Sequence, residues 1–224
     1  MRSFLIALLA LISIPSYAGI PQSNEIVFDI LRNGKPFGSH VLTFDKSGDE
    51  VQVNVDIEMK YKLGPLTLFK YEHDNTEIWK DGLLQRVETK TNDDGKDLWL
   101  KASYDDGNIN ITSSSGEYTG TKDLMTTSYW TMDMMSQDEI LNTQYGRIHN
   151  VEIEDLGVVE KEIAGQRFKA HKFNFIDLDD DREAIFYYEV NTKQWVGLEL
   201  SIRGSNLEYV RQTPLPVQYA LKDK

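Results

Sequence analysis

Residues 50–60 alternate apolar and polar side chains without a break, and this pattern constrains the fold more than any other feature of the chain. The segment reads EVQVNVDIEMK, and its apolar members are Val51, Val53, Val55, Ile57 and Met59. Successive side chains of a β-strand point to opposite faces of the sheet. The alternation therefore predicts a strand with one buried face and one solvated face.

Residue pairs that suit tight turns separate this segment from similar ones along the chain. They are Asn33-Gly34, Ser47-Gly48, Gly64-Pro65, Asp81-Gly82, Asp94-Gly95, Asp106-Gly107, Ser115-Gly116, Tyr145-Gly146, Leu156-Gly157, Ala164-Gly165 and Arg203-Gly204. Asn-Gly and Asp-Gly pairs favour two-residue hairpins, whose short connections make neighbouring strands antiparallel. We therefore predict an all-β fold of roughly a dozen strands, arranged as a single strongly curved antiparallel meander sheet or open barrel.

One segment, residues 124–146, lacks the period of two and holds four of the six methionines. Ser136 and Glu139 have the spacing of a helix capping box, so we expect a short helix over residues 136–142. We interpret the whole segment as a helical or irregular crossover that caps one end of the sheet. No linker or change in composition divides the remainder, which predicts a single all-β domain over residues 19–224.

The first eighteen residues have the composition of a secretory signal peptide. Arg2 precedes an apolar run over residues 4–14, and small residues follow as far as Ala18. Because a membrane span needs about 17–25 apolar residues, this run is too short to serve as an anchor. We expect cleavage after Ala18, a periplasmic or secreted protein that begins at Gly19, and no transmembrane segment after cleavage.

The chain contains no cysteine and carries a net charge of −12. Without cysteine there is no lipoprotein anchor, thiolate metal site or thiol nucleophile. The negative charge of the chain as a whole opposes nucleic acid or an anionic lipid surface as a partner. The four histidines stand in no metal-binding pattern, and we expect neither a metal site nor a cofactor. The acidic run at Asp177, Asp179 and Asp181 places Arg182 and Tyr188 where a calcium loop requires glycine and glutamate, so an acidic hairpin turn is expected there.

The densest cluster of polar and aromatic residues lies in YEHDNTEIWKDGLL, residues 71–84. On a strand, Tyr71, His73, Glu77 and Trp79 share the more apolar face and should point inward. His73 and Glu77 would then lie about 13 Å apart, too far to form an acid–base pair or to bind one metal ion through this strand alone. The pattern leaves two interpretations: hydrogen-bonded structural residues, or a polar patch inside a ligand cavity or active site.

Aromatic side chains are abundant, and one concave face could hold a ligand. The candidate ligand-binding residues are Tyr71, His73, Glu77, Trp79, Tyr129, Trp130 and Met134. The rings suit an apolar or sugar-like ligand, and methionine beside Trp130 would give an adaptable lining. If the chain is an enzyme, His73 would act as the base and Glu77 either as the residue that orients His73 or as the acid.

Several characteristic segments also follow one another along the chain in a fixed order. FDILRNGKPFGSHVLTF is followed by YEHDNTEIWKDG, TTSYW, LNTQYG and FYYEVNTKQWVGLEL. In this order the chain resembles an uncharacterised family of secreted bacterial proteins, the domain-of-unknown-function family numbered 6134, from about residue 25 to residue 209. Tyr188-Glu189 stands where the family usually has Tyr-Asp. The resemblance implies a periplasmic all-β protein and supplies no activity.

Three functions remain open at this stage. The first is a non-enzymatic envelope protein that binds an apolar or amphiphilic ligand, or a partner chain, in its concave face. The second is a structural or assembly protein of the envelope without a small-molecule site. The third is an envelope hydrolase or lyase that uses His73 and a carboxylate.

Overall fold

The computed structural model describes residues 18–202 and 204–221 and contains fifteen strands and two short 3-10 helices in these ranges. The elements are β1 Glu25–Arg32, β2 Lys35–Ser47, β3 Glu50–Leu63, β4 Leu66–Lys80, β5 Leu83–Asp93, β6 Lys96–Asp105, β7 Asn108–Ser113, β8 Gly116–Thr121, β9 Met125–Thr126, η1 Met132–Ser136, β10 Glu139–Asn142, β11 Arg147–Ile163, β12 Gln166–Asp177, β13 Arg182–Glu189, β14 Trp195–Ile202, β15 Ser205–Arg211 and η2 Val217–Tyr219. The predicted signal peptide lies outside the described residues, except for Ala18.

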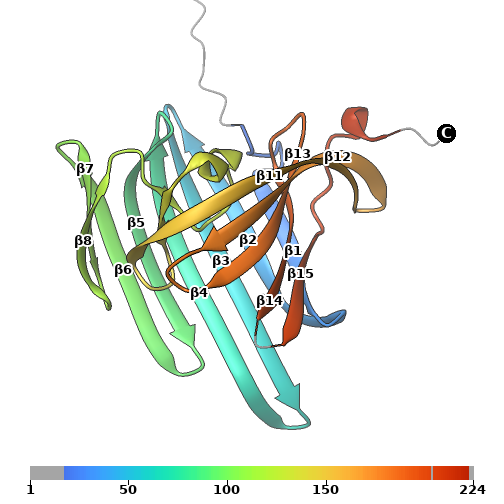
Figure 1. Ribbon diagram of the computed structural model, residues 1–224, viewed down its shortest axis with the longest axis horizontal. Coiled ribbons are helices and arrows are strands. Elements are labelled where there is room, and N and C mark those ends of the chain that lie inside the picture. Colours follow the sequence, from blue (N-terminus) through green and yellow to red (C-terminus); the bar gives the residue numbers. More distant parts are fainter. Residues whose placement is uncertain (1–17, 203, 222–224) are drawn as a thin grey trace, which may run out of the picture.

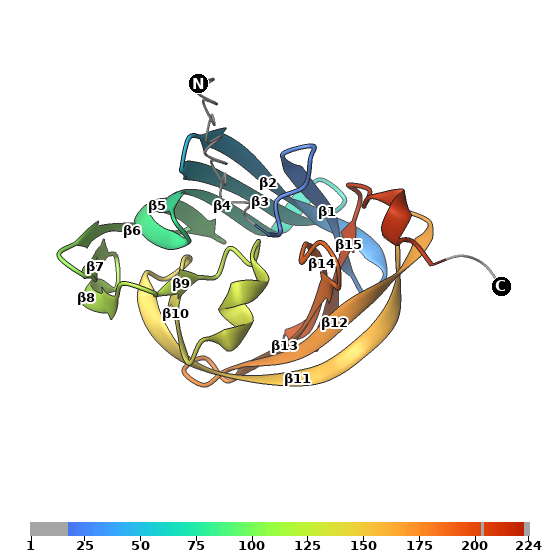
Figure 2. The same ribbon diagram turned by 90° about the horizontal axis from the view of Figure 1, so that it is seen from above.

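All strands belong to one sheet in the order β8-β7-β6-β5-β4-β3-β2-β1-β15-β14-β13-β12-β11-β10-β9. Two meanders, β1–β8 and β10–β15, are joined by antiparallel pairing of β1 with β15. Neighbours are antiparallel apart from the short β9–β10 pair. The sheet curls until β8 approaches β11 without joining it (Figures 1 and 2). The predicted fold class, an open and strongly curved antiparallel sheet, is confirmed.

Several of the predicted turns have the backbone conformation that a two-residue hairpin requires. At Asn33-Gly34, Asp81-Gly82, Asp94-Gly95, Asp106-Gly107 and Ala164-Gly165, both residues of the pair have positive φ.

The prediction of a turn at Leu156-Gly157 is wrong. These two residues form a bulge inside β11, where the pairing with β12 shifts between Asp155 and Val158. Gly157, with φ of 85°, absorbs the extra residue and donates its N–H to the Asp155 carboxylate.

The crossover is present, but the helix expected over residues 136–142 is not. A 3-10 helix ends at Ser136, and Glu139–Asn142 forms strand β10. Ser136 donates its hydroxyl to the Asp133 carbonyl instead of capping a new helix. Ile140 and Leu141 are both buried, and β10 pairs with β11. Long-range pairing and burial therefore override the local capping signal.

Residues 124–137, here called the plug, lie within the curve of the sheet (Figure 2). Their buried apolar side chains are Leu124, Met125, Trp130, Met134 and Met135, all in the main hydrophobic core. The core therefore consists of the inward faces of the strands packed around this segment. Among the described residues, no helix is long and apolar enough to cross a membrane.

Candidate functional site

Strand β4 directs the predicted residues inward, as its alternation indicates. Tyr71, His73, Asn75, Glu77 and Trp79 are all buried, and Glu77 is fully enclosed at 0 % exposure. The residues between them are exposed or half-buried on the outer surface. The inward orientation predicted for this face is therefore confirmed.

Glu77 is the centre of a buried hydrogen-bond network. Its Oε1 accepts from Asn75 Nδ2 at 2.8 Å, and its Oε2 accepts from Trp79 Nε1 at 2.7 Å and from Ser128 Oγ at 3.1 Å. Desolvation raises the pKa of the Glu77 carboxyl, and the hydrogen bonds from Asn75, Trp79, Thr126 and Ser128 act in the opposite direction. Because Thr126 and Ser128 belong to the plug, Glu77 ties the plug to the wall of the sheet.

His73 has a separate set of partners. Its Nδ1 is 2.7 Å from Thr91 Oγ1 on β5, and its Nε2 is 3.4 Å from Thr143 Oγ1. Burial lowers the pKa of His73 to about 4, which keeps the ring neutral at physiological pH. No hydrogen bond between His73 and Glu77 is found among the described residues, and each is engaged by its own neighbours. This arrangement gives no direct path for a proton between them.

The aromatic residues of the plug pack against both walls of the sheet. The Trp130 ring lies edge-on to Trp79, with centroids 5.7 Å apart, and to Phe44 at 5.8 Å. Met134 is 1 % exposed. Glu77, Trp79, Trp130 and Met134 thus occupy the filled part of the interior, where a ligand would have to displace the plug to reach them.

Tyr129 has an unusual backbone conformation for an aromatic residue, with φ of 62°. Its carbonyl accepts from the Tyr188 hydroxyl at 2.9 Å, and its ring contacts Phe186, with centroids 4.8 Å apart. Burial raises the pKa of Tyr129 to about 12, so the phenol stays neutral. Tyr129 is half-buried, unlike the buried Trp130, and packs against the main hydrophobic core.

The inward face of β3 changes from buried to exposed along the strand. Val55 is 4 % exposed, Ile57 and Met59 are half-buried, and Tyr61 and Leu63 are 42 % and 65 % exposed. The same change occurs on β4 from Tyr71, at 8 %, to the half-buried Phe69. The apolar face of this hairpin therefore extends beyond the part of the interior that the plug fills.

Strand β2 contributes a partly covered aromatic side chain to this uncovered region. Phe37 stacks on Phe69, with ring centroids 5.8 Å apart, and packs against the core together with Ile57 and Met59. Ala184 and Leu200, on β13 and β14, are partly covered members of the same core. We call Phe37, Ile57, Met59 and Phe69 the open face. The alternation places Phe69 on the inward face, but the sequence did not identify Phe37 or Phe69 as ligand-binding residues, because their contact depends on strand register and not on spacing along the chain.

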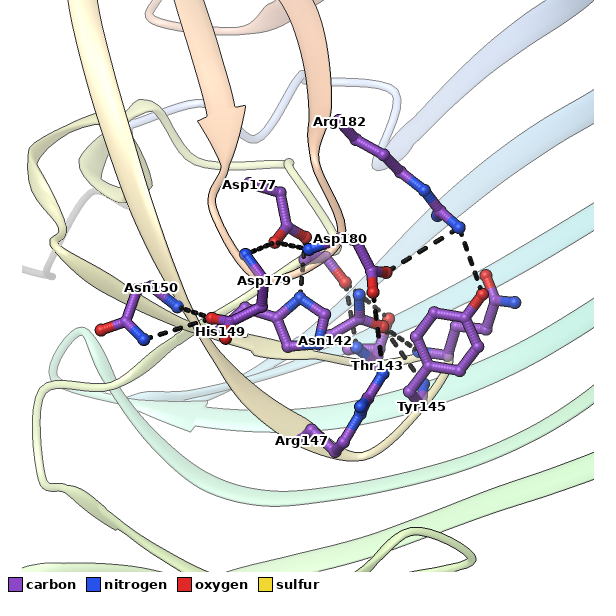
Figure 3. A network of polar contacts seen from close by, with 12 residues as sticks. Asn142, Thr143, Tyr145, Arg147, His149, Asn150, Asp177, Asp179, Asp180 and Arg182 are labelled. Carbon is purple, nitrogen blue, oxygen red and sulfur yellow. Dashed lines mark hydrogen bonds and ion pairs between the residues drawn. The ribbon is translucent and has the colours of Figure 1, made fainter. Parts of the chain in front are cut away.

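A second polar cluster surrounds His149, near the turn between β12 and β13 (Figure 3). His149 Nδ1 is 2.7 Å from Asp177 Oδ2, and both residues are buried. Asp177 Oδ1 accepts the backbone N–H groups of Asp179 and Asp180, which shapes the predicted acidic turn. The Tyr145 ring lies nearly parallel to His149, with centroids 6.5 Å apart.

Ligand atoms of His149, Asp177 and Asp180 lie within 4.8 Å of one another, a spacing that one cation could bridge. Two guanidinium groups already compensate Asp180, with Arg147 Nη2 at 3.7 Å and Arg182 Nη2 at 3.8 Å (Figure 3). These positive charges oppose a divalent ion at the same carboxylate. The cluster is better explained as a polar clamp that joins β11 to the turn after β12.

The interior and the uncovered apolar side chains define a class: an all-β protein built on one open, curled sheet around an internal plug. Within that class, the model of the domain-of-unknown-function family DUF6134 matches residues 28–212. The chain belongs to this family, which confirms the resemblance seen in the sequence.

Solved structures share the fold. One of them is the crystal structure of a beta-barrel-like protein of domain of unknown function DUF1849 from Brucella abortus, with a TM-score of 0.57 and 12 % identity over 84 % of this chain and 94 % of that one. No curated protein matches the chain.

Proposed function

We propose that this chain is a non-enzymatic envelope protein that holds an apolar or amphiphilic ligand against the open face. One observation carries the proposal: the inward side of β3 keeps its apolar character from Val55 to Leu63 while its exposure rises from 4 % to 65 %. Burying this surface against an apolar molecule would contribute about 25 cal/mol for each Å² removed from water. The envelope location is inferred from the composition of residues 1–18.

The surrounding groups suit an amphiphile better than a fully apolar molecule. Ile57, Met59 and Phe69 would contact an acyl chain or another apolar body, and the flexible thioether of Met59 adapts to its shape. Tyr71 borders these residues, and its hydroxyl donates to Gln144 Oε1 at 3.3 Å. Burial and the neighbouring Tyr209 raise the pKa of Tyr71 well above its usual value. A neutral phenol of this kind would orient a polar head group by hydrogen bonding.

The observed geometry favours binding over catalysis. His73 and Glu77 are both buried and held by different partners, so neither is free to act on a substrate. A purely structural role would predict closure over all the large rings, and Trp99, on the outside of β6, is 42 % exposed. A purely structural role also does not explain why the open face stays uncovered on the inner side of the sheet.

The proposal is tested with a fluorescent fatty-acid probe and the chain that begins at Gly19. Replacing Ile57 and Met59 by aspartate places two charges on the open face, and we expect probe binding about tenfold weaker or more, which corresponds to 1.4 kcal/mol. Val158→Asp is the matched control, because Val158 is 51 % exposed on the distant strand β11. Equal affinity in both variants would refute binding at the open face.

A further inference from the structure

The hairpin formed by β3 and β4 projects beyond the rest of the sheet at the bottom of Figure 1. Its end is apolar and exposed: Tyr61, Leu63, Leu66 and Leu68 are 42 %, 65 %, 59 % and 46 % exposed. We call residues 60–70 the hairpin tip. A group of large apolar side chains exposed together marks an interaction surface more often than scattered single residues do.

The strand pairing gives the tip a defined shape. Leu63 pairs directly with Leu66 across Gly64-Pro65, so both side chains lie on the same side of the hairpin. The register shifts beyond Tyr61 and leaves Leu68 as the extra residue on β4. Gly64 has φ of 59°, and a Cβ at this position would meet no atom within 4 Å. The turn therefore leaves space for a binding partner of the exposed leucines.

The charge of the tip is opposite to that of the protein. Residues 60–70 contain Lys60, Lys62 and Lys70 and no acidic residue, although the chain as a whole carries −12. Lys70 pairs with Glu72 at 2.7 Å, whereas Lys60 and Lys62 are exposed and form no ion pair within the part of the chain that the structure describes. The lysines around the exposed leucines of the hairpin tip are complementary to a surface that carries negative charge on the outside and is apolar underneath.

We propose that the hairpin tip docks this protein on an anionic lipid bilayer. Leu63, Leu66 and Leu68 enter the boundary between head groups and acyl chains, while Lys60 and Lys62 extend their ammonium groups to the lipid phosphates. The net negative charge of the remaining surface keeps the rest of the molecule off the membrane and sets its orientation. Because few side chains insert, attachment is reversible and weakens as salt rises.

This inference does not depend on the proposed ligand, because the exposed leucines and lysines that carry it are not members of the open face; Phe69 alone belongs to both sets. It does give the open face a location. Met59, at the end of the open face, directly precedes the hairpin tip, and Phe69 belongs to it. Docking of the tip therefore brings the open face to the bilayer surface. The tip would then place the open face where an amphiphile enters or leaves.

The experiment measures flotation of the chain from Gly19 with vesicles that contain phosphatidylglycerol and with vesicles of phosphatidylcholine alone. Two tip variants are compared: Leu63→Ser with Leu66→Ser and Leu68→Ser, and Lys60→Gln with Lys62→Gln. The matched controls are Val158→Ser with Leu178→Ser, which are 51 % and 56 % exposed elsewhere, and Lys101→Gln with Lys169→Gln, which are also exposed. Circular dichroism checks that each variant keeps its strand content.

We expect binding to the anionic vesicles, weakened about tenfold or more by either tip variant and by high salt, and unchanged in both controls. Absence of binding to both kinds of vesicle overturns the proposal, as does binding that the tip variants leave intact. If the protein instead forms a dimer in light scattering that the leucine variant dissociates, and vesicles are not bound, the tip pairs with a second copy and the proposal is wrong. A failure of fatty-acid probe binding alone leaves these outcomes unaffected.

Discussion

Replacing Glu77 by alanine should destabilise the protein more than replacing any exposed acidic residue of the same sheet. The change leaves Asn75 Nδ2, Trp79 Nε1 and Ser128 Oγ without their acceptor in a fully buried site. An unpaired buried donor costs about 1–3 kcal/mol, and the carboxyl group's own desolvation cost is recovered in part. We therefore expect a loss of about 3–5 kcal/mol in the free energy of unfolding.

Urea unfolding measures this loss, and Glu77→Gln separates charge from shape. Glutamine retains one acceptor oxygen, so its cost should be smaller, about 1–2 kcal/mol. Glu58→Ala is the control, because Glu58 is exposed on β3, and its effect should stay within about 0.5 kcal/mol. A loss below about 1 kcal/mol for Glu77→Ala would refute the reasoning that this carboxylate fastens the plug.

The pH dependence gives the same prediction a second test. Burial raises the folded-state pKa of Glu77 above its ordinary value of 4.5, so the folded protein holds this proton more tightly than the unfolded chain. Stability contributed by the group is therefore full below 4.5 and is lost as pH rises through the raised pKa. Glu77→Gln should remove this part of the pH profile. An unchanged profile would contradict the assignment.

Three further substitutions test other parts of the structure. His40 is buried among the rings of Phe28, Trp195 and Tyr209, and neither of its ring nitrogens has a hydrogen-bond partner among the described residues. Burial lowers the pKa of His40 to about 3, so the folded protein excludes a proton that the unfolded chain binds below 6.5. His40→Phe should therefore be more stable than the native chain in urea, with a gap that widens as pH falls from 6.5. A Cβ at Gly38 would collide with the Glu58 carbonyl oxygen, so Gly38→Ala should lower the melting temperature and cost about 2 kcal/mol or more. At an open turn such as Gly48, alanine should cost only about 1 kcal/mol. Asp177→Asn weakens the 2.7 Å contact to His149 Nδ1 and should lower the free energy of unfolding in urea by about 1–2 kcal/mol. The NMR signals of the His149 ring should change as well, and unaltered signals would exclude the contact.

The parts of the fold that local patterns determine could be predicted from the sequence. The alternation in residues 50–60 and 69–79 places side chains on one face of a strand, and the structure confirms which face is inward. Asn-Gly and Asp-Gly pairs suit positive φ by their own chemistry, and those turns are present. Burial of His73 and Glu77 on the inner face follows from the same period of two.

The remaining features depend on contacts between residues that are distant in sequence. Pairing of β1 with β15 joins the two meanders, and neither strand carries a local sign of its partner. Ser128 reaches Glu77 across 51 positions, and His149 reaches Asp177 across 28, so no motif spacing could reveal these bonds. The extent of the open face could not be predicted either, because the alternation in β3 is the same where the plug covers it and where it does not.

Native mass spectrometry of the protein purified from its own envelope without detergent tests most directly whether the open face carries an apolar or amphiphilic ligand. We expect an additional mass of a small amphiphile on the native chain, which is lost when Ile57 and Met59 are replaced by aspartate and retained in Val158→Asp. A clean mass of the chain alone for the native protein, or a bound molecule that survives the open-face substitutions, would contradict it.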